Sequence, residues 1–252
     1  MTVVNFLLDV LLGVVLGTTG GLFGIGGGLI AIPILGLVFG LDQQMAQGTA
    51  LVMVVPNVVL AVWRYNQHNR IDPRNAAALA VPGCICAYIG SQWAVELPAD
   101  LMRQGFAGFL LALALYMIYR LLSGRVTGST QLRHGLPALM VLGAVAGIMG
   151  GLMAVGSAVV ATPGLTGLFG ASQVVAQGLS LALALPSTCV TLVVYAWHGQ
   201  VDWSLGVPLA LGGLLSISWG VKLAHTLPER LLRGLFAGFL MICAIALYVQ
   251  VA

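Results

Sequence analysis

Long apolar segments recur along the whole chain and are separated by short polar loops. Crossing the ~30 Å hydrocarbon core of a bilayer takes about 20 residues of α-helix. Because lipid offers the backbone no hydrogen bonds, a spanning segment satisfies its own polar groups most readily as a helix. The pattern therefore predicts an all-α polytopic membrane protein. The clearest segments are residues 44–62, 76–95, 106–119, 174–195, 205–221 and 235–251.

Composition agrees with this prediction and narrows the function classes. Of the 252 residues, 60% are hydrophobic and only 7% are charged, whereas ordinary globular domains carry about 25% charged residues. The formal net charge of +3 comes from basic residues dispersed in loops, so we expect a lipid bilayer and not nucleic acid as a partner. The chain has no HExxH, GxSxG or Gly-Lys-Ser/Thr motif, and its four cysteines lack CxxC spacing. We therefore expect no enzyme activity, no cofactor and no metal site.

The chain contains two copies of one pattern, offset by 130 positions. The stretch GTTGGLFGIGGGLIAIPIL from Gly17 aligns without a gap with GIMGGLMAVGSAVVATPGL from Gly147, and the tripeptide AQG recurs at 46–48 and 176–178. Internal repeats of this kind are common in transporters. We therefore predict two four-element repeats, over about residues 5–121 and 135–251. The corresponding divisions are repeat 1 (1–122), a cytoplasmic connector (123–134) and repeat 2 (135–252).

Equivalent loops of the two repeats differ in charge. The loop near 64–74 has three arginines, while its copy near 194–204 has no Lys or Arg. The loop near 96–103 has only Arg103, while its copy is basic. Since Lys and Arg favour cytoplasmic loops, we expect the repeats to be inverted relative to each other. Eight ordinary helices in two parallel repeats are the alternative.

Inversion requires each repeat to open with a glycine-broken helical hairpin that returns to the side it left. The bends fall at 24–28 in repeat 1 and at 154–157 in repeat 2. Each arm is expected to have about 15 residues, or ~23 Å of helix. A helix that restarts inside the bilayer presents free N–H groups and a partial positive charge, which favour anions. Close helix packing is the alternative role of such glycines.

The candidate substrate-binding residues combine backbone donors at the bends with neutral side chains in and after the AQG elements. The amides and hydroxyls are expected to face the bends and donate to an anion; capping or bridging of helices is the alternative. The set is Gly24, Gly26, Gly27, Gly28, Gln47, Gly48, Thr49, Gly156, Ser157, Gln177, Gly178 and Ser180. The candidates for gating or a proton relay are Pro33, Pro163, Arg64, His68 and His198.

These motifs resemble those of the sulfite exporter TauE/SafE (TSUP) family of membrane transporters. The resemblance rests on GLFGIGGGLIAIPIL from Gly21, its degenerate copy, the AQG elements and HGQVDW from His198, and it covers nearly the whole chain. It implies a multi-pass protein of the cell (inner) membrane that moves anions, often sulfite or small organosulfonates. The second bend has Ser157 where the first has Gly27, which leaves open whether both halves contact the substrate equally.

Together, the repeat and the resemblance predict a secondary transporter, in the exporting direction, for a small anion. Sulfite or a small organosulfonate is the expected substrate, moved by alternating access between the two repeats. An anion channel, or a non-transporting membrane partner of a complex, is the alternative. The exact substrate, the direction, coupling to protons and a homodimeric state stay open at this point.

Overall fold

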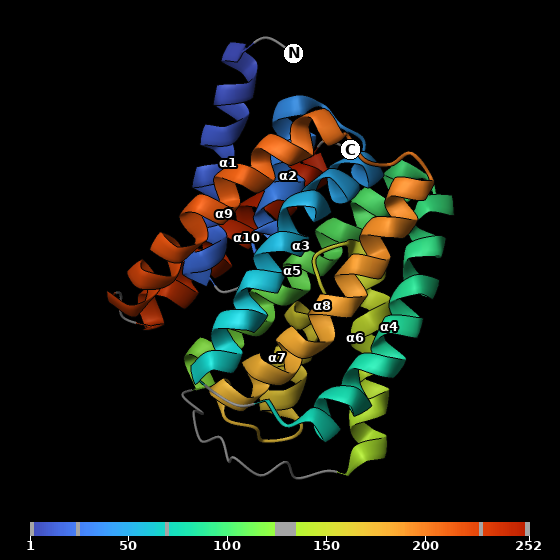
Figure 1. The fold of residues 1–252 in the computed structure, drawn as a ribbon, viewed down its shortest axis with the longest axis vertical. Coiled ribbons are helices and arrows are strands. Elements are labelled where there is room, and N and C mark those ends of the chain that lie inside the picture. Colours follow the sequence, from blue (N-terminus) through green and yellow to red (C-terminus); the bar gives the residue numbers. More distant parts are fainter. Residues whose placement is uncertain (1–2, 24–25, 69–70, 124–134, 227–228, 250–252) are drawn as a thin grey trace.

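A computed structural model describes residues 3–23, 26–68, 71–123, 135–226 and 229–249, and all its regular elements are α-helices (Figure 1). This confirms the prediction of an all-α protein. In chain order the helices are α1 (Val3–Phe23), α2 (Gly28–Phe39), α3 (Gln43–His68), α4 (Pro73–Glu96), α5 (Ala99–Ser123), α6 (Leu136–Met153), α7 (Ala158–Gly167), α8 (Gln173–Trp197), α9 (Trp203–Thr226) and α10 (Glu229–Val249). The connector residues 124–134 lie outside the described part of the chain.

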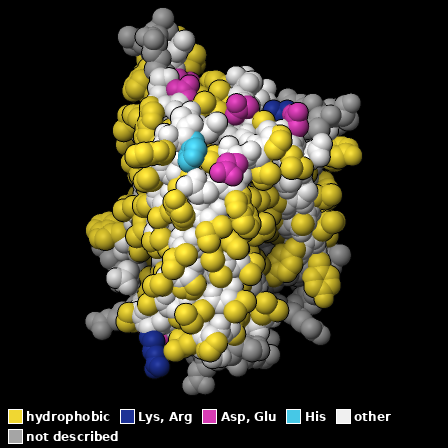
Figure 2. All heavy atoms as spheres, turned by 90° about the vertical axis from the view of Figure 1, so that its right-hand side faces the viewer, with side chains coloured by type: hydrophobic (Ala, Val, Ile, Leu, Met, Phe, Trp, Pro, Cys, Tyr) yellow, Lys and Arg dark blue, Asp and Glu magenta, His cyan; other side chains and the backbone are white. Residues whose placement is uncertain are grey.

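Within the described part of the chain, seven helices are long and apolar enough to cross a membrane, namely α1, α3, α4, α5, α6, α8 and α9. The helices α2 and α7 are shorter apolar helices, and α10 contains the shorter apolar stretch Ala237–Tyr248. Figure 2 shows that hydrophobic side chains cover most of one face of the molecule, with acidic side chains near one end. This arrangement fits a polytopic membrane protein.

Both glycine-rich stretches interrupt a helix. The first break lies between Phe23 and Gly28, and the second lies between Met153 and Ala158. The expectation of about 15 residues in each arm is wrong, because α1 has 21 residues and α2 has 12. The second hairpin is uneven in the same sense, with 18 residues in α6 and 10 in α7. At 1.5 Å per residue the returning arms are about 18 and 15 Å long, so they fall short of a full crossing.

Two helix pairs pack unusually closely through glycines. The helix α1 packs against α9, and α4 packs against α6. Added Cβ atoms at these glycines would lie within 3 Å of the partner's backbone. The contacting pairs are Gly13–Leu209 and Gly17–Gly213 between α1 and α9, and Gly143–Leu79 and Gly147–Gly83 between α6 and α4. Both pairs therefore run parallel, and their contacts correspond position by position under the offset of 130.

The central helices α3 and α8 pack side by side and run antiparallel. Near the start of α3, Gln47 bonds Tyr195 near the end of α8. Near the start of α8, Gly178 lies against the ring of Tyr65 near the end of α3. The helices α5 and α10 pack against each other. The main buried core draws residues from both halves of the chain.

Charged side chains divide between the two ends of the bundle. The Gln44 amide donates to the Leu97 carbonyl (2.7 Å), so the start of α3 lies beside the end of α4. The backbone N–H of Asp202 donates to Thr49 Oγ1 (3.0 Å), which brings the start of α9 to the same place. We call this the acidic end. Its acidic residues are Asp9, Asp42, Glu96, Asp100 and Asp202, and it also has the basic Arg103, which lies 3.9 Å from Asp100. The opposite end, where α3 ends and α4 begins with Arg64 and Arg74, is called the arginine end.

Candidate functional site

The two glycine bends, far apart in the sequence, meet inside the bundle. A Cβ placed on Gly28 would lie 3.8 Å from the Ala154 carbonyl oxygen and 3.9 Å from the Val155 Cα atom. In Figure 1 the loop between α6 and α7 lies near the middle of the bundle. The structure thus brings together Gly28 from the first bend and the start of the second.

The bends owe their shape to left-handed backbone conformations. Gly26 and Gly27 have φ values of 70° and 89°, and Gly156 has a φ of 85°. Residues with a Cβ rarely adopt such values, whereas glycine does so freely. Ala154, at the position of Gly24 in the first repeat, also has a positive φ of 54°. Gly24 itself lies outside the described residues.

Each bend ends at the N-terminus of a short buried helix. In α2 the N–H groups of Ile30 and Ala31 both donate to the Gly27 carbonyl, at 3.2 and 2.9 Å. In α7 the N–H of Ala161 donates to the Ser157 carbonyl at 2.9 Å. The N–H groups of Val159 and Val160 also donate, to the Gly156 and Ser157 carbonyls at 3.3 and 3.2 Å. The N–H groups that have no earlier helical turn to donate to are therefore those of Gly28, Leu29 and Ala158. Two helix N-termini with partial positive charge therefore begin within the protein interior, an arrangement that suits an anion.

Buried polar side chains hold the two bends from the central helices. Asn57 of α3 donates from Nδ2 to the Gly26 carbonyl (3.2 Å). Ser187 of α8 shares a 2.7 Å hydrogen bond with Ser157. Asn57, Ser157 and Ser187 are all at most 1% exposed. Asn57 and Ser187 occupy equivalent positions of the repeat, directly after Pro56 and Pro186. Sequence reasoning missed this pair, although its polar character at one repeat position was the available signal.

Gln47 and Thr49 lie in the protein interior at the acidic end. The Tyr195 hydroxyl donates to Gln47 Oε1 (2.9 Å), and it also lies 3.3 Å from the Leu152 carbonyl oxygen. Gln47 and Tyr195 are fully buried, and Gln47 Nε2 has no partner among the described residues. Thr49 accepts the hydrogen bond from the N–H of Asp202. Both residues therefore fasten α3 to α8 and α9.

The second copy of the AQG element lies at the other end of the bundle. Gln177 is exposed, and a Cβ on Gly178 would meet the Tyr65 ring at 2.5 Å. Positions 47 and 65 of α3 are separated by about 27 Å along a helix axis. The structure therefore does not bring Gln47 and Gln177 together around one small anion.

Three further residues, Ser180, Gly48 and Gln43, have buried polar atoms or close contacts. Ser180 is buried, and its hydroxyl lacks a partner within the described ranges. Gly48 lies against the Gln200 carbonyl, so it permits a close approach of α3 to the loop before α9. Gln43, one turn before Gln47, is 3% exposed, and its Nε2 likewise finds no partner in the described part of the chain. Sequence reasoning missed Gln43, although Gln173 repeats it.

The gating candidates are scattered over the bundle. Pro33 is buried inside α2 and Pro163 is half-buried inside α7. Arg64 and His68 belong to the last turns of α3, but their side chains lie outside the description. His198 is exposed at the end of α8, with Nδ1 2.9 Å from the Val194 carbonyl oxygen. Only the two prolines therefore lie on helices that begin at the bends.

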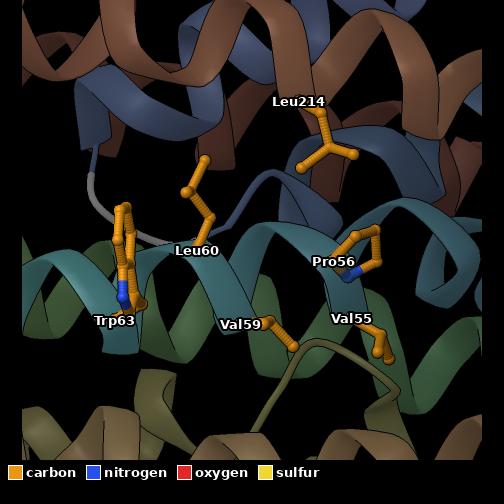
Figure 3. Close-up of a pocket in the computed structure, with 6 residues that line it drawn as sticks. All are labelled: Val55, Pro56, Val59, Leu60, Trp63 and Leu214. Atoms are coloured by element: carbon orange, nitrogen blue, oxygen red, sulfur yellow. The ribbon is translucent and has the colours of Figure 1, made fainter.

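A groove of about 510 Å³ runs along α3 around Pro56 (Figure 3). Its lining residues are Val55, Pro56, Val59, Leu60, Trp63 and Leu214. All six side chains are apolar apart from the indole N–H, so the groove offers an anion little stabilisation. Among the described residues, no group of three His, Cys, Asp or Glu side chains could hold a metal ion.

Comparisons with known proteins agree on one family. A family model described as "Sulfite exporter TauE/SafE" matches residues 10–247. A probable membrane transporter protein of Xylella fastidiosa is 27% identical, over 99% of this chain and 96% of the relative. The probable membrane transporter protein YdhB of Bacillus subtilis is 24% identical over 92% of each chain. A probable membrane transporter protein of Methanocaldococcus jannaschii is 26% identical over 62% of this chain and 60% of the relative.

Proposed function

Since the chain belongs to the sulfite exporter TauE/SafE family, we propose that it exports a small anion, with sulfite or a small organosulfonate as the substrate. The protein is a multi-pass membrane transporter and not an enzyme. The substrate, the direction and the alternating-access mechanism are the proposed parts.

The main support for this proposal is that the bend before α2 and the bend before α7 lie next to each other inside the bundle. An oxyanion accepts hydrogen bonds at each oxygen, and the N-termini of α2 and α7 offer backbone donors without a charged side chain. The neighbouring hydroxyls of Ser157 and Ser187 supply neutral partners. Neutral donors replace only part of the hydration that a bound anion loses. The anion is therefore held with moderate affinity and can dissociate again. The proposed site comprises Gly24, Gly26, Gly27, Gly28, Gly156 and Ser157.

The placement of Gln47 and Gln177 narrows the proposed binding set. Because they lie at opposite ends of the α3–α8 pair, we assign neither amide to the central anion. Ser180 is likewise on α8 near its start, and Gly48, Thr49 and Gly178 serve helix contacts. The central site therefore depends on the bends rather than on the AQG elements.

The directions of the helices support the proposal that the repeats are inverted. The helices α3 and α8 occupy equivalent places in the two repeats, yet they run antiparallel. An antiparallel pair of equivalents is what a two-fold axis in the membrane plane produces. Two substitutions test this topology: Arg74→Cys and Ser204→Cys occupy matching, exposed positions in the first turns of α4 and α9. An impermeant thiol reagent should label them from opposite sides of the membrane, and labelling from one side would contradict the inversion.

The export direction is supported by the charge of the two ends. Lys and Arg near spans favour the cytoplasmic side, which places the arginine end in the cytoplasm. A basic mouth raises the local concentration of an anion, and an acidic mouth lowers it. The acidic end has five acidic residues (Asp9, Asp42, Glu96, Asp100 and Asp202) against one basic residue, Arg103, and its net negative charge therefore discourages re-entry from outside.

A flux assay with a matched pair of variants tests the site. Gly26 and Gly40 have nearly the same left-handed backbone, with φ values of 70° and 66°. A Cβ at Gly26 would project toward Val54 and Val58 at the bend, whereas at Gly40 it would meet no described atom within 4 Å. Proteoliposomes should transport labelled sulfite or an organosulfonate. Gly26→Ala should reduce that flux more than Gly40→Ala does, because only the former adds a methyl group at the bend. Equal flux in the two variants would refute the site, and a wild-type protein that moves none of these anions would refute the substrate class.

A further inference from the structure

Two glutamine amides on one face of α3 have buried nitrogens without an acceptor. Gln43 and Gln47 lie one turn apart at the start of α3, and residues four apart share a helix face with their Cβ atoms about 6 Å apart. Their side chains are 3% and 0% exposed. The Nε2 atom of each has no partner among the described residues. Since an amide nitrogen carries two N–H donors, this face of α3 has several buried donors that the described part of the chain leaves unused.

The neighbouring Gln44 shows how a glutamine with a structural role is satisfied at the same place. It is 4% exposed, as buried as Gln43. Its Nε2 donates to the Leu97 carbonyl at 2.7 Å and to the Ala94 carbonyl at 3.3 Å. Burying a donor without an acceptor is unfavourable. Stability of the fold therefore accounts for Gln44 but not for the amide nitrogens of Gln43 and Gln47.

The amide of Gln47 lies near the second bend. The Tyr195 hydroxyl donates to Gln47 Oε1 at 2.9 Å, so that Nε2 is the unused atom of this amide. The same hydroxyl lies 3.3 Å from the carbonyl oxygen of Leu152, one residue before the end of α6. The amide is therefore held beside the point where the chain enters the second bend.

The two amides are separate from the central site at the bends. Val54 contacts the first bend, since a Cβ on Gly28 would lie 2.7 Å from Val54 Cγ2. Gln47 lies on the same side of α3 as Val54, about 10 Å nearer the acidic end, and Gln43 lies a further turn away. An anion at the bends does not reach Gln43. The amides thus line a position between the bends and the acidic end.

The occupant that fits these nitrogens is a small oxyanion. N–H donors bind acceptors and repel metal cations, and two amides one turn apart suit the several acceptor oxygens of a sulfite or sulfonate group. The nearest carboxylate in the sequence, Asp42, is exposed, and its Oδ1 already accepts the Met45 N–H at 2.8 Å. Neutral donors close to a negatively charged end hold an anion only briefly, as release requires.

We propose that Gln43 and Gln47 form a second oxyanion site on the exit side of the bends, in which the Nε2 atoms of both amides donate to oxygens of one ion. The identity of the ion and the word exit rest on the proposed function. The site itself is tested by binding alone, without transport.

The amide protons themselves report on binding. Protein labelled with ¹⁵N-glutamine is titrated in detergent micelles with sulfite, and separately with methanesulfonate, with sodium chloride as the control for ionic strength. The side-chain N–H resonances of Gln43, Gln44 and Gln47 are assigned by their loss in Gln43→Met, Gln44→Met and Gln47→Met. Sulfite should shift the resonances of Gln43 and Gln47 with one common dissociation constant. Those of Gln44 should stay in place, because its donors are already bonded.

The methionine variants test whether the two amides act together. Gln43→Met should weaken binding, read at the Gln47 amide, by about tenfold to about a hundredfold, the range for hydrogen bonds to a charged group. Gln44→Met should leave that dissociation constant unchanged. Without anion the order of stability should reverse. Gln43→Met removes an unpaired buried donor and should unfold at the wild-type temperature or above it, whereas Gln44→Met should unfold at a lower temperature.

Three results would overturn the second site. They are unmoved Gln43 and Gln47 resonances, which would indicate hydration only; equal shifts in chloride or at Gln44; and a dissociation constant at Gln47 that ignores Gln43→Met. Failure of this site and failure of the proposed function are distinguishable. Sulfite flux with unmoved resonances would refute the second site alone, and shifted resonances in a protein without flux would refute only the proposed transport.

Discussion

Replacement of Gly147 by alanine should destabilise the protein by separating α4 from α6. The added Cβ would lie 2.1 Å from the Gly83 carbonyl oxygen, whereas an ordinary C···O contact needs about 3.3 Å. The helices must therefore move apart by roughly 1 Å at this point. Gly143 and Gly151, one turn on either side, touch the same partner helix at Leu79 and Ala87. The movement thus loosens a run of three close contacts.

The expected loss follows from overpacking. Forcing an extra methyl group into a tightly packed interior costs about 1–3 kcal/mol, and rigid backbone on both sides puts Gly147→Ala near the upper value. The matched control is Gly108→Ala in α5, where a Cβ would find no described atom within 4 Å. That variant should be neutral or more stable by up to about 1 kcal/mol, since alanine favours helix. Thermal unfolding in detergent micelles compares the two. Unchanged stability of Gly147→Ala, or an equal loss in Gly108→Ala, would refute the packing account.

Three other substitutions follow from single contacts. Ala154→Gly should stabilise the fold by about 0.5–1 kcal/mol in thermal unfolding, because it relieves a left-handed residue that carries a Cβ; a lower melting temperature would contradict this. Thr49→Val should destabilise by about 1–3 kcal/mol, since the N–H of Asp202 loses its acceptor; equal stability to wild type would show that another acceptor replaces Thr49. Asn57→Leu should release the Gly26 carbonyl and lower anion flux at temperatures at which the variant is still folded. Normal flux would show that Asn57 does not shape the bend.

The positions of the two helix breaks could be predicted from the sequence. The offset of 130 aligns two glycine-rich stretches, and glycine runs before a proline-bearing segment favour a turn. The structure ends α1 at Phe23 and begins α7 at Ala158, as this pattern indicates. The lengths of the helices on either side of each break could not be predicted. The long first arms depend on how far α1 and α6 pack along α9 and α4, which is a tertiary property.

The two glutamines show where repeat symmetry stops being informative. Gln47 and Gln177 have the same neighbours in the AQG element, so the sequence predicts one environment for both. One is fully buried and the other is exposed. The difference depends on the tertiary contacts at each end of the α3–α8 pair, which the repeated sequence does not specify. Asn57 was missed for another reason: polar residues at its repeat position marked it, but its partner is a backbone carbonyl of the bend, and no sequence pattern identifies a carbonyl partner.

Exchange of anions across a membrane tests the central claim most directly. Proteoliposomes that contain the wild-type protein are loaded with unlabelled sulfite or with buffer alone, and the entry of labelled sulfite is followed as its concentration rises. A carrier whose two ends open in alternation should show saturable entry, accelerated by sulfite on the opposite side. Entry that rises linearly with concentration and ignores the opposite side would contradict alternating access and indicate a channel.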